Sequence, residues 1–343
     1  MVMKERNNKP LHILQGHTHT IKNIEFSADS QWLLTDSEDK SARLWHVDSG
    51  KQKQVFHGED AALSPDGRFV VTMSSDETMY LWNAQTGTQI AKLEEREEKA
   101  TTITFLSRIP LAFSLDGNYL ATGSTDRTVI RMWYTKTGAL KQVFTGHTDT
   151  IRQVAFSPDG FLLASASDDD TAIIWNTQTG EKVHILKHDD FVDSVVFSPD
   201  GLYLATRTLV MTDVRLWLIQ TGKLIATLPQ CESPIFLPDR KHLMAYSRSK
   251  KFIGTWNTKA GAVVSKVTLE TNHDESVNLS PDGRLAALST ANNTLAIYNE
   301  KTGKQERVLE GHIDDEFMPT FSPDGSIIAA TSHGQTVLLW RVD

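Results

Sequence analysis

Histidine and aspartate are the residue types in this chain that could carry acid–base or metal chemistry. The 343 residues include twelve histidines but one cysteine, Cys231, and no Cys/His pair has the spacing of a metal site. His17, His147, His188 and His312 each stand ten residues before the first residue of a repeated turn sequence. A register shared by separate repeats indicates a structural role. Phosphate-binding glycine loops and nucleophile motifs are missing as well. We therefore predict no catalytic residue, no metal, no cofactor and no enzyme activity.

The turn that follows these histidines is the main repeated element of the sequence. SPDG occurs at 64–67, 157–160, 198–201, 280–283 and 322–325, and degenerate copies occur at 27–30, 114–117 and 237–240. Proline favours the second position of a type I turn, aspartate caps the backbone, and glycine accepts the left-handed conformation that follows. Such a turn between apolar runs predicts a β-hairpin.

Each hairpin is followed by an alternating apolar run that an aromatic residue closes. The closing residues are Trp45, Trp82, Trp133, Trp175, Trp217, Trp256, Tyr298 and Trp340. A second turn of the type QTG or KTG follows most of them, so each unit supplies four short strands. Eight such units predict an all-β propeller built of radially repeated four-stranded sheets. Seven blades are the alternative, if unit 6 or the shortened unit 2 forms no blade.

The units resemble WD40 repeats, in particular the plain, SPDG-rich repeats of bacterial WD40 proteins. The fourth unit has Gly146-His147, then SPDG, then a Ser-x-Asp-x-Thr turn, then Trp175. The resemblance implies a hydrogen-bonded chain of histidine, serine or threonine, aspartate and tryptophan in each complete unit. These positions fall on His147, Ser165, Asp169 and Trp175 in unit 4 and on His17, Thr35, Asp39 and Trp45 in unit 1. Unit 5 departs from the pattern, because Val210 stands where the aspartate is expected.

The ends of the sequence suggest how the ring closes. The last unit ends after its third strand, and Leu11-His12-Ile13-Leu14 is a strand without a unit of its own. The family resemblance implies that this N-terminal strand completes the last blade, which removes an unpaired edge. We expect residues 1–10 to form a flexible extension and residues 11–343 to form one propeller of eight repeats.

Two neighbouring turns break the repeat pattern most strongly. In unit 5, Leu209-Val210-Met211 follows Arg207 where a polar turn is expected, and in unit 6, Arg248, Lys250 and Lys251 occupy a turn that should be acidic. The apolar run either packs inward or forms an exposed contact patch. We interpret these seven residues as a partner-binding surface on the variable rim, defined as the rim that carries the entry loops and the Ser-x-Asp-x-Thr turns. The run Glu94-Glu95-Arg96-Glu97-Glu98-Lys99 is interpreted as a solvated loop.

The bulk properties and the repeats together favour a non-catalytic scaffold for protein–protein or protein–peptide interactions. The net charge of −8 argues against a nucleic-acid partner, and no apolar run is long enough for a membrane span. We expect a cytoplasmic monomer. Two alternatives stay open: a sensor or regulatory propeller that works with a signalling or defence enzyme, and a propeller enzyme with its site at the channel mouth.

Overall fold

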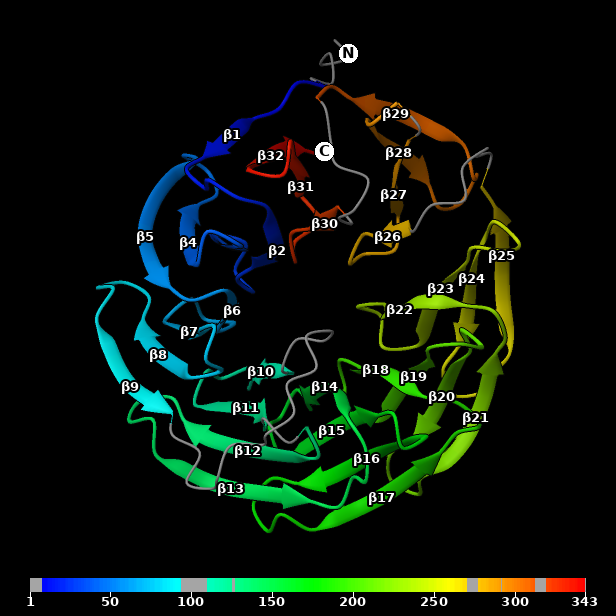
Figure 1. Cartoon of the computed structure of the whole chain (residues 1–343). Coiled ribbons are helices and arrows are strands. Elements are labelled where there is room, and N and C mark those ends of the chain that lie inside the picture. The colour runs from blue at the N-terminus through cyan, green and yellow to red at the C-terminus, as the bar shows by residue number, and fades with distance from the viewer. Residues whose placement is uncertain are drawn as a thin grey trace.

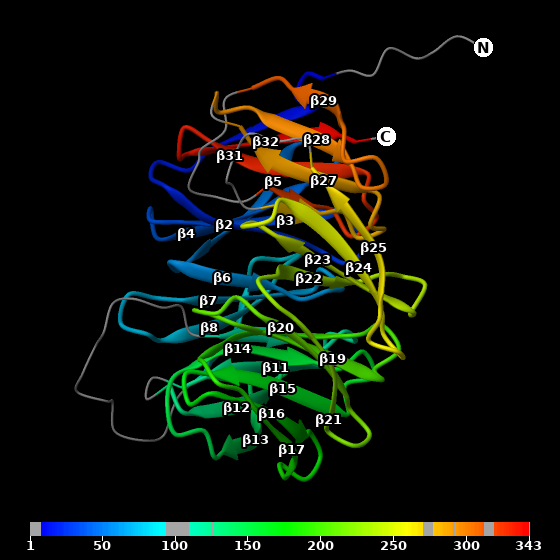
Figure 2. The ribbon, with the colours of Figure 1, turned by 90° about the vertical axis from the view of Figure 1, so that its right-hand side faces the viewer.

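The computed structural model describes residues 8–93, 110–124, 127–269, 277–290, 292–311 and 319–342. Within these residues the chain forms thirty-two β-strands and no helix. The strands make eight four-stranded sheets, which surround a central axis as the blades of a propeller (Figure 1). Figure 2 shows the ring from the side, with strands running from one rim towards the other. The described residues contain no helix that could cross a membrane.

The blades follow one another in chain order, and each is named here by its number. Blades 1 to 4 are β2 (Ile21–Phe26), β3 (Trp32–Ser37), β4 (Ser41–His46) and β5 (Lys51–His57); β6 (Asp60–Leu63), β7 (Phe69–Met73), β8 (Met79–Asn83) and β9 (Gln89–Leu93); β10 (Leu111–Phe113), β11 (Tyr119–Gly123), β12 (Val129–Tyr134) and β13 (Leu140–Thr145); and β14 (Ile151–Phe156), β15 (Leu162–Ser167), β16 (Thr171–Asn176) and β17 (Lys182–Lys187).

Blades 5 to 8 are β18 (Val192–Phe197), β19 (Tyr203–Thr208), β20 (Val214–Leu218) and β21 (Lys223–Leu228); β22 (Glu232–Phe236), β23 (His242–Ser247), β24 (Phe252–Asn257) and β25 (Val263–Thr268); β26 (Val277–Leu279), β27 (Leu285–Ser289), β28 (Leu295–Asn299) and β29 (Gln305–Leu309); and β30 (Thr320–Phe321), β31 (Ile327–Ser332), β32 (Thr336–Arg341) and β1 (His12–Gln15). Units 2 and 6 each form a complete sheet, so the ring has eight blades and the seven-blade alternative is wrong.

The SPDG turns have the geometry that their residue types predict. In blade 4 the Gly160 N–H donates to the Ser157 carbonyl at 2.9 Å, and Gly160 has a φ of 73°. The Ser157 hydroxyl donates to Asp159 at 2.6 Å and accepts from the Leu162 N–H at 2.9 Å. These bonds satisfy the polar groups at the tip of the hairpin locally, so the turn forms wherever the four residues recur.

The N-terminal strand closes the ring, as expected. β1 pairs antiparallel with β32, with Leu14 opposite Val337 and His12 opposite Leu339, and β1 is therefore the outermost strand of blade 8. The Leu14 side chain is 2% exposed and packs in one core cluster with Val337 of blade 8 and Trp45 of blade 1. Closure thus joins the first and last repeats both by backbone hydrogen bonds and by apolar packing.

The hydrophobic core lies between neighbouring blades. The cluster between blades 4 and 5 contains Ala164 and Ile174 from one sheet and Val192, Leu204 and Trp217 from the next. Because the strands of a blade alternate in direction, the SPDG turns and the QTG-type turns lie on one rim. The entry loops and the turns between second and third strands lie on the other, the variable rim.

Candidate functional site

The four side chains that are expected to form a hydrogen-bonded chain in blade 4 do so. The Trp175 Nε1–H donates to Ser165 Oγ at 2.8 Å, and His147 Nε2 lies 2.7 Å from the same oxygen. His147 Nδ1 lies 2.7 Å from Asp169 Oδ2. Since a carboxylate only accepts, His147 Nδ1 carries a proton and donates it to Asp169. The chain of bonds therefore runs from Trp175 through Ser165 and His147 to Asp169.

Asp169 also holds the turn that contains it. Its carboxylate accepts from the Thr148 N–H at 3.0 Å and from the Thr171 hydroxyl at 2.6 Å. Burial by itself would raise the pKa of this carboxyl, but the hydrogen bonds from His147, Thr171 and Thr148 outweigh it and hold the pKa far below its usual value. An acid kept ionised and fully bonded is suited to support structure.

Blade 1 repeats this arrangement with threonine in place of serine. The Trp45 Nε1–H donates to Thr35 Oγ1 at 3.0 Å, His17 Nε2 lies 2.8 Å from that oxygen, and His17 Nδ1 lies 2.9 Å from Asp39. Burial lowers the pKa of His17, so the imidazole is neutral at neutral pH. The equivalent Asp126 in unit 3 and His312 in unit 8 lie outside the described residues, as does the charged run 94–99.

Blade 5 keeps the chain of bonds without its aspartate. The Trp217 Nε1–H and His188 Nε2 both bond to Thr206 Oγ1, at 2.9 and 2.7 Å. His188 Nδ1 lies 3.0 Å from the Leu186 carbonyl, which takes the role of the missing carboxylate. Burial, reinforced by the positive charge of Arg215, lowers the pKa of His188 to about 4. The network of blade 5 therefore needs no side chain at position 210.

The Cys231 thiol and the Asp168 carboxylate could also take part in chemistry, but both have structural roles. The Cys231 thiol is buried, and burial raises its pKa to about 11, so it stays protonated at neutral pH. Asp168, the neighbour of Asp169 in the same turn, forms a two-bond ion pair with Arg152, at 2.7 and 2.5 Å. The pair joins the innermost strand of blade 4 to the turn between its second and third strands. The described residues contain no cluster of metal-ligating side chains.

The apolar turn of blade 5 projects into solvent. The Leu209, Val210 and Met211 side chains are 44%, 71% and 52% exposed. Asp190 of the entry loop accepts hydrogen bonds from the N–H groups of Val210 and Met211, both at 2.8 Å. The backbone of the turn is therefore held while its side chains point outward. The apolar run is therefore exposed and does not pack inward, and its role as a contact patch stays a prediction.

The basic turn of blade 6 meets the apolar turn across a shared hollow. Val210 and Met211 from blade 5 and Arg248 and Lys250 from blade 6 line one cavity of about 1000 Å³. Glu232 also lines it and lies 3.6 Å from Arg248. β19, β20, β23 and β24, which carry the two turns, belong to neighbouring blades (Figure 1). Residues about forty apart in the sequence thus form one surface.

The structure brings together only some of the residues that we had grouped on this surface. Arg207 does not line the hollow; it is paired through two hydrogen bonds with Asp193 of the innermost strand, which raise its pKa against the effect of burial. Lys251 is also not among the residues that line the cavity. The ion pair between Arg207 and Asp193 was not predicted from the sequence.

Phe191 is a surface residue that the sequence analysis missed. It is 43% exposed, and its carbonyl accepts from the Leu209 N–H at 2.9 Å, so it lies directly beside the apolar turn. The signal was present in the sequence: Thr20 and Thr150 occupy the corresponding entry-loop position in units 1 and 4. An aromatic residue at a position that is otherwise polar marks the same surface.

Comparison with protein families agrees with this architecture. The model of the first β-propeller of IFT122 matches residues 109–340, more than half of the chain, and the WD domain, G-beta repeat model matches residues 8–46. The chain belongs to the WD40-repeat β-propeller family. The hydrogen-bonded chains of blades 1 and 4 are the arrangement that the resemblance to WD40 repeats implied.

Individual relatives of this WD40 propeller match it over part of their length. The small ribosomal subunit protein RACK1 of Caenorhabditis elegans is 35% identical over 52% of this chain and 54% of its own. The nuclear distribution protein PAC1 of Arthroderma otae is 29% identical over 51% of this chain and 33% of its own. The chain thus spans about half or less of these relatives. A crystal structure of the computationally designed Ika8 protein covers 98% of the chain with a TM-score of 0.76 at 20% identity, which shows the fold alone.

Proposed function

We propose that this WD40 propeller is a non-catalytic scaffold that binds a protein or peptide partner on the variable rim at blades 5 and 6. The observation that carries the proposal is the hollow shared by the apolar turn and the basic turn. The name of RACK1 as a protein of the small ribosomal subunit, an assembly of macromolecules, supports a scaffold role. We also propose that the protein is a monomer and that it is cytoplasmic; the single cysteine supports the reducing compartment.

The apolar turn supplies the centre of the proposed contact. Phe191, Leu209, Val210 and Met211 are all exposed and come from adjacent loops that are hydrogen-bonded to each other. Exposed apolar clusters of this kind are typical of interaction sites, because burying them against a partner removes their surface from water. The Asp190 bonds hold the turn in place beforehand, so little backbone order is lost when a partner binds.

The basic turn supplies the rim of the proposed contact and its charge preference. Arg248 and Lys250 line the same hollow as Val210 and Met211, on a protein whose net charge is −8. Both cations are exposed and face the cavity beside Glu232. A partner segment with a hydrophobic anchor flanked by acidic residues fits this arrangement. The anchor provides the affinity, and the charges mainly steer the encounter.

A random-peptide display library, selected on the immobilised protein, tests the proposal. We expect the enriched peptides to carry an apolar anchor next to aspartate or glutamate. The double variant Val210→Asn, Met211→Ser should bind them at least about tenfold more weakly. Asparagine is used at 210 because a carboxylate there would face Asp190. Lys250→Glu should mainly slow association, and the effect should fade at high salt.

Phe161→Asp is the matched control, since Phe161 is 61% exposed on the opposite rim. It should bind the selected peptides as the unaltered protein does. Undiminished binding by the double variant would place the contact elsewhere on the ring. A drop of several degrees in its melting temperature would show instead that the two side chains stabilise the fold. A selection that enriches no peptide of this type would also contradict the proposal.

A further inference from the structure

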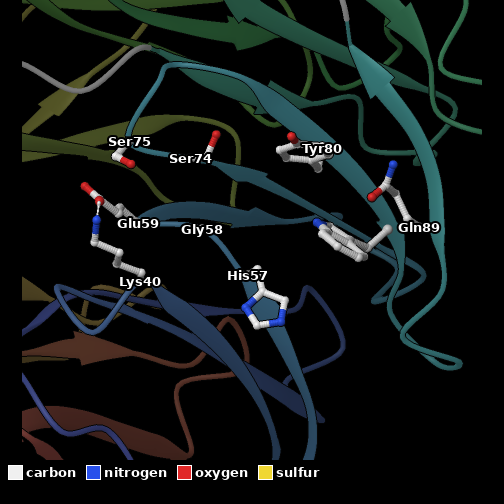
Figure 3. Close-up of a pocket in the computed structure, with 9 residues that line it drawn as sticks. Lys40, His57, Gly58, Glu59, Ser74, Ser75, Tyr80 and Gln89 are labelled. Atoms are coloured by element: carbon white, nitrogen blue, oxygen red, sulfur yellow. Dashed lines mark ion pairs between the residues drawn. The ribbon is translucent and has the colours of Figure 1, made fainter.

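A second hollow, called here the hollow of blade 2, lies where blade 2 meets blade 1 and is separate from the surface of blades 5 and 6. It has a volume of about 460 Å³, and Trp82, Tyr80, His57, Glu59, Lys40 and Gln89 are among the residues that line it. Figure 3 shows Tyr80 and His57 on opposite sides of Gly58, with the Glu59–Lys40 pair at one end and Gln89 at the other. Trp82 and Tyr80 are both half-buried, and their ring centroids lie 6.1 Å apart at 42°.

In blades 4 and 5 a cation of the chain itself binds the backbone of the entry loop. In blade 4 the Lys182 ammonium lies 5.6 Å from the Trp175 ring and donates to the Gly146 carbonyl at 3.1 Å. In blade 5 the Arg215 guanidinium donates to the Lys187 carbonyl at 3.2 Å, and Lys187 is the residue equivalent to Gly146. Both cations thus reach the carbonyl that precedes the entry histidine.

Blade 1 follows the same plan with an arginine. Arg43 stands two residues before Trp45, as Arg215 stands two residues before Trp217, and its guanidinium lies against Gly16, which precedes His17. Arg43 also donates to Gln52 at 2.6 Å, and Gln52 is the residue paired with Trp45 on the outermost strand. In blades 1, 4 and 5 the cation therefore comes from one of two positions: two residues before the tryptophan, or opposite the tryptophan on the fourth strand.

Blade 2 has a neutral residue at both of these positions. Tyr80 stands two residues before Trp82, and Gln89 pairs with Trp82 on β9. The entry segment is also shorter, with seven residues between Phe56 and Ser64 against twelve between Phe144 and Ser157 in blade 4. Among the described residues, no histidine side chain bonds to the Thr72 hydroxyl, as His147 does to Ser165 in blade 4. The Trp82 Nε1–H donates to Thr72, and the Thr72 hydroxyl donates to the His57 backbone carbonyl at 2.7 Å.

We propose that the hollow of blade 2 binds an arginine side chain of a protein partner, beside the two positions from which blades 1, 4 and 5 supply a cation of their own. The Trp82 and Tyr80 rings offer aromatic faces on which a planar guanidinium stacks. Glu59 provides a carboxylate at one end of the hollow, and Gln89 provides an amide oxygen at the other. Lys40 lies 3.3 Å from Glu59 but is 67% exposed, so it can turn into solvent when a guanidinium arrives.

Fluorine NMR of protein labelled with 5-fluorotryptophan tests the site directly. The Trp82 signal is assigned by its loss in Trp82→Phe, and the probe is N-acetyl-arginine methylamide. We expect a saturable shift of the Trp82 signal alone. The citrulline analogue has the same shape without the charge and should bind at least about fivefold more weakly. Lys40→Ala frees Glu59 and should tighten arginine binding about twofold, whereas Glu59→Gln should weaken it about threefold.

Two substitutions fill the site from within the chain. Tyr80→Arg reproduces the arginine of blades 1 and 5, and Gln89→Lys reproduces Lys182 of blade 4, so both should abolish the shift while the protein stays folded. Gln85→Lys adds the same charge on an exposed turn and should leave the shift intact. Equal shifts with the arginine and citrulline probes, a response that persists in Gln89→Lys, or no response at Trp82 would each overturn the proposal. A shift with choline but not with arginine would reassign the site to small quaternary ammonium ligands.

Discussion

Replacing Asp169 by alanine is the sharpest test of how the blades are held together. The carboxylate accepts four hydrogen bonds: from His147 Nδ1 at 2.7 Å, from the Thr148 N–H at 3.0 Å, and from the Thr171 N–H and hydroxyl at 3.0 and 2.6 Å. Alanine removes the acceptor for all of them. Thr148 is exposed and Thr171 is half-buried, so water can replace the carboxylate there. The His147 side chain is fully buried, so its N–H loses its partner.

The expected cost follows from that difference. An unsatisfied buried donor costs about 1–3 kcal/mol, and the lost charge-assisted bonds of the turn add a smaller amount, so we expect a destabilisation of about 3 kcal/mol. With an unfolding entropy of about 2.1 cal/mol/K per residue, a chain of this length should then melt about 4 °C lower. Blade 5, which folds with Val210 at this position, shows why the variant should remain folded.

Calorimetry and urea denaturation of three variants measure this effect. Asp169→Asn keeps an acceptor for His147 without the charge and should lose about half as much stability as alanine. Asp170→Asn is the control: it removes a charge from the same turn at an exposed residue with a φ of 61°, which asparagine tolerates, and should change stability by less than about 0.5 kcal/mol. Asp168 is unsuitable as a control because it binds Arg152. Equal losses at positions 169 and 170 would show that the network does not stabilise the blade.

Two further predictions concern ring closure and acid stability. Deleting residues 1–15 should lower the melting temperature by several degrees, and so should Leu14→Asp. Ile13→Asp, at a side chain that is 56% exposed, should have little effect. A deletion variant with the melting temperature of the intact protein would contradict closure by β1. His188 has a pKa of about 4 in the folded protein against 6.5 in the unfolded chain, so below pH 6.5 the unfolded chain takes up the proton first. The contribution of neutral His188 to the free energy of unfolding is therefore complete above pH 6.5 and should fall by up to about 3 kcal/mol by pH 4. Urea titrations of His188→Asn should show a shallower pH dependence over this window, and equal slopes would refute the assignment.

Local features of this protein were predictable from its sequence because they depend on residues close together in the chain. Ser157, Asp159 and Gly160 satisfy one another within a single turn, so five copies of SPDG and three degenerate ones were enough to count the hairpins. The constant spacing from His147 to Trp175 marked the hydrogen-bonded positions, through the resemblance to WD40 repeats. Counting strands then left Leu11 to Leu14 without a unit, which indicated the closure that β1 makes with β32.

The tertiary structure alone decided which distant side chains meet. Arg152 of β14 pairs with Asp168 in the turn after β15, and Asp193 of β18 pairs with Arg207 of β19; no periodic pattern marks such pairs. Val210 and Arg248 share a hollow only because blades 5 and 6 are packed side by side. The hollow of blade 2 is also hard to predict, since the residues that line it come from two neighbouring blades. Backbone turns form from local hydrogen bonds, whereas hollows and ion pairs depend on how whole sheets are positioned against each other.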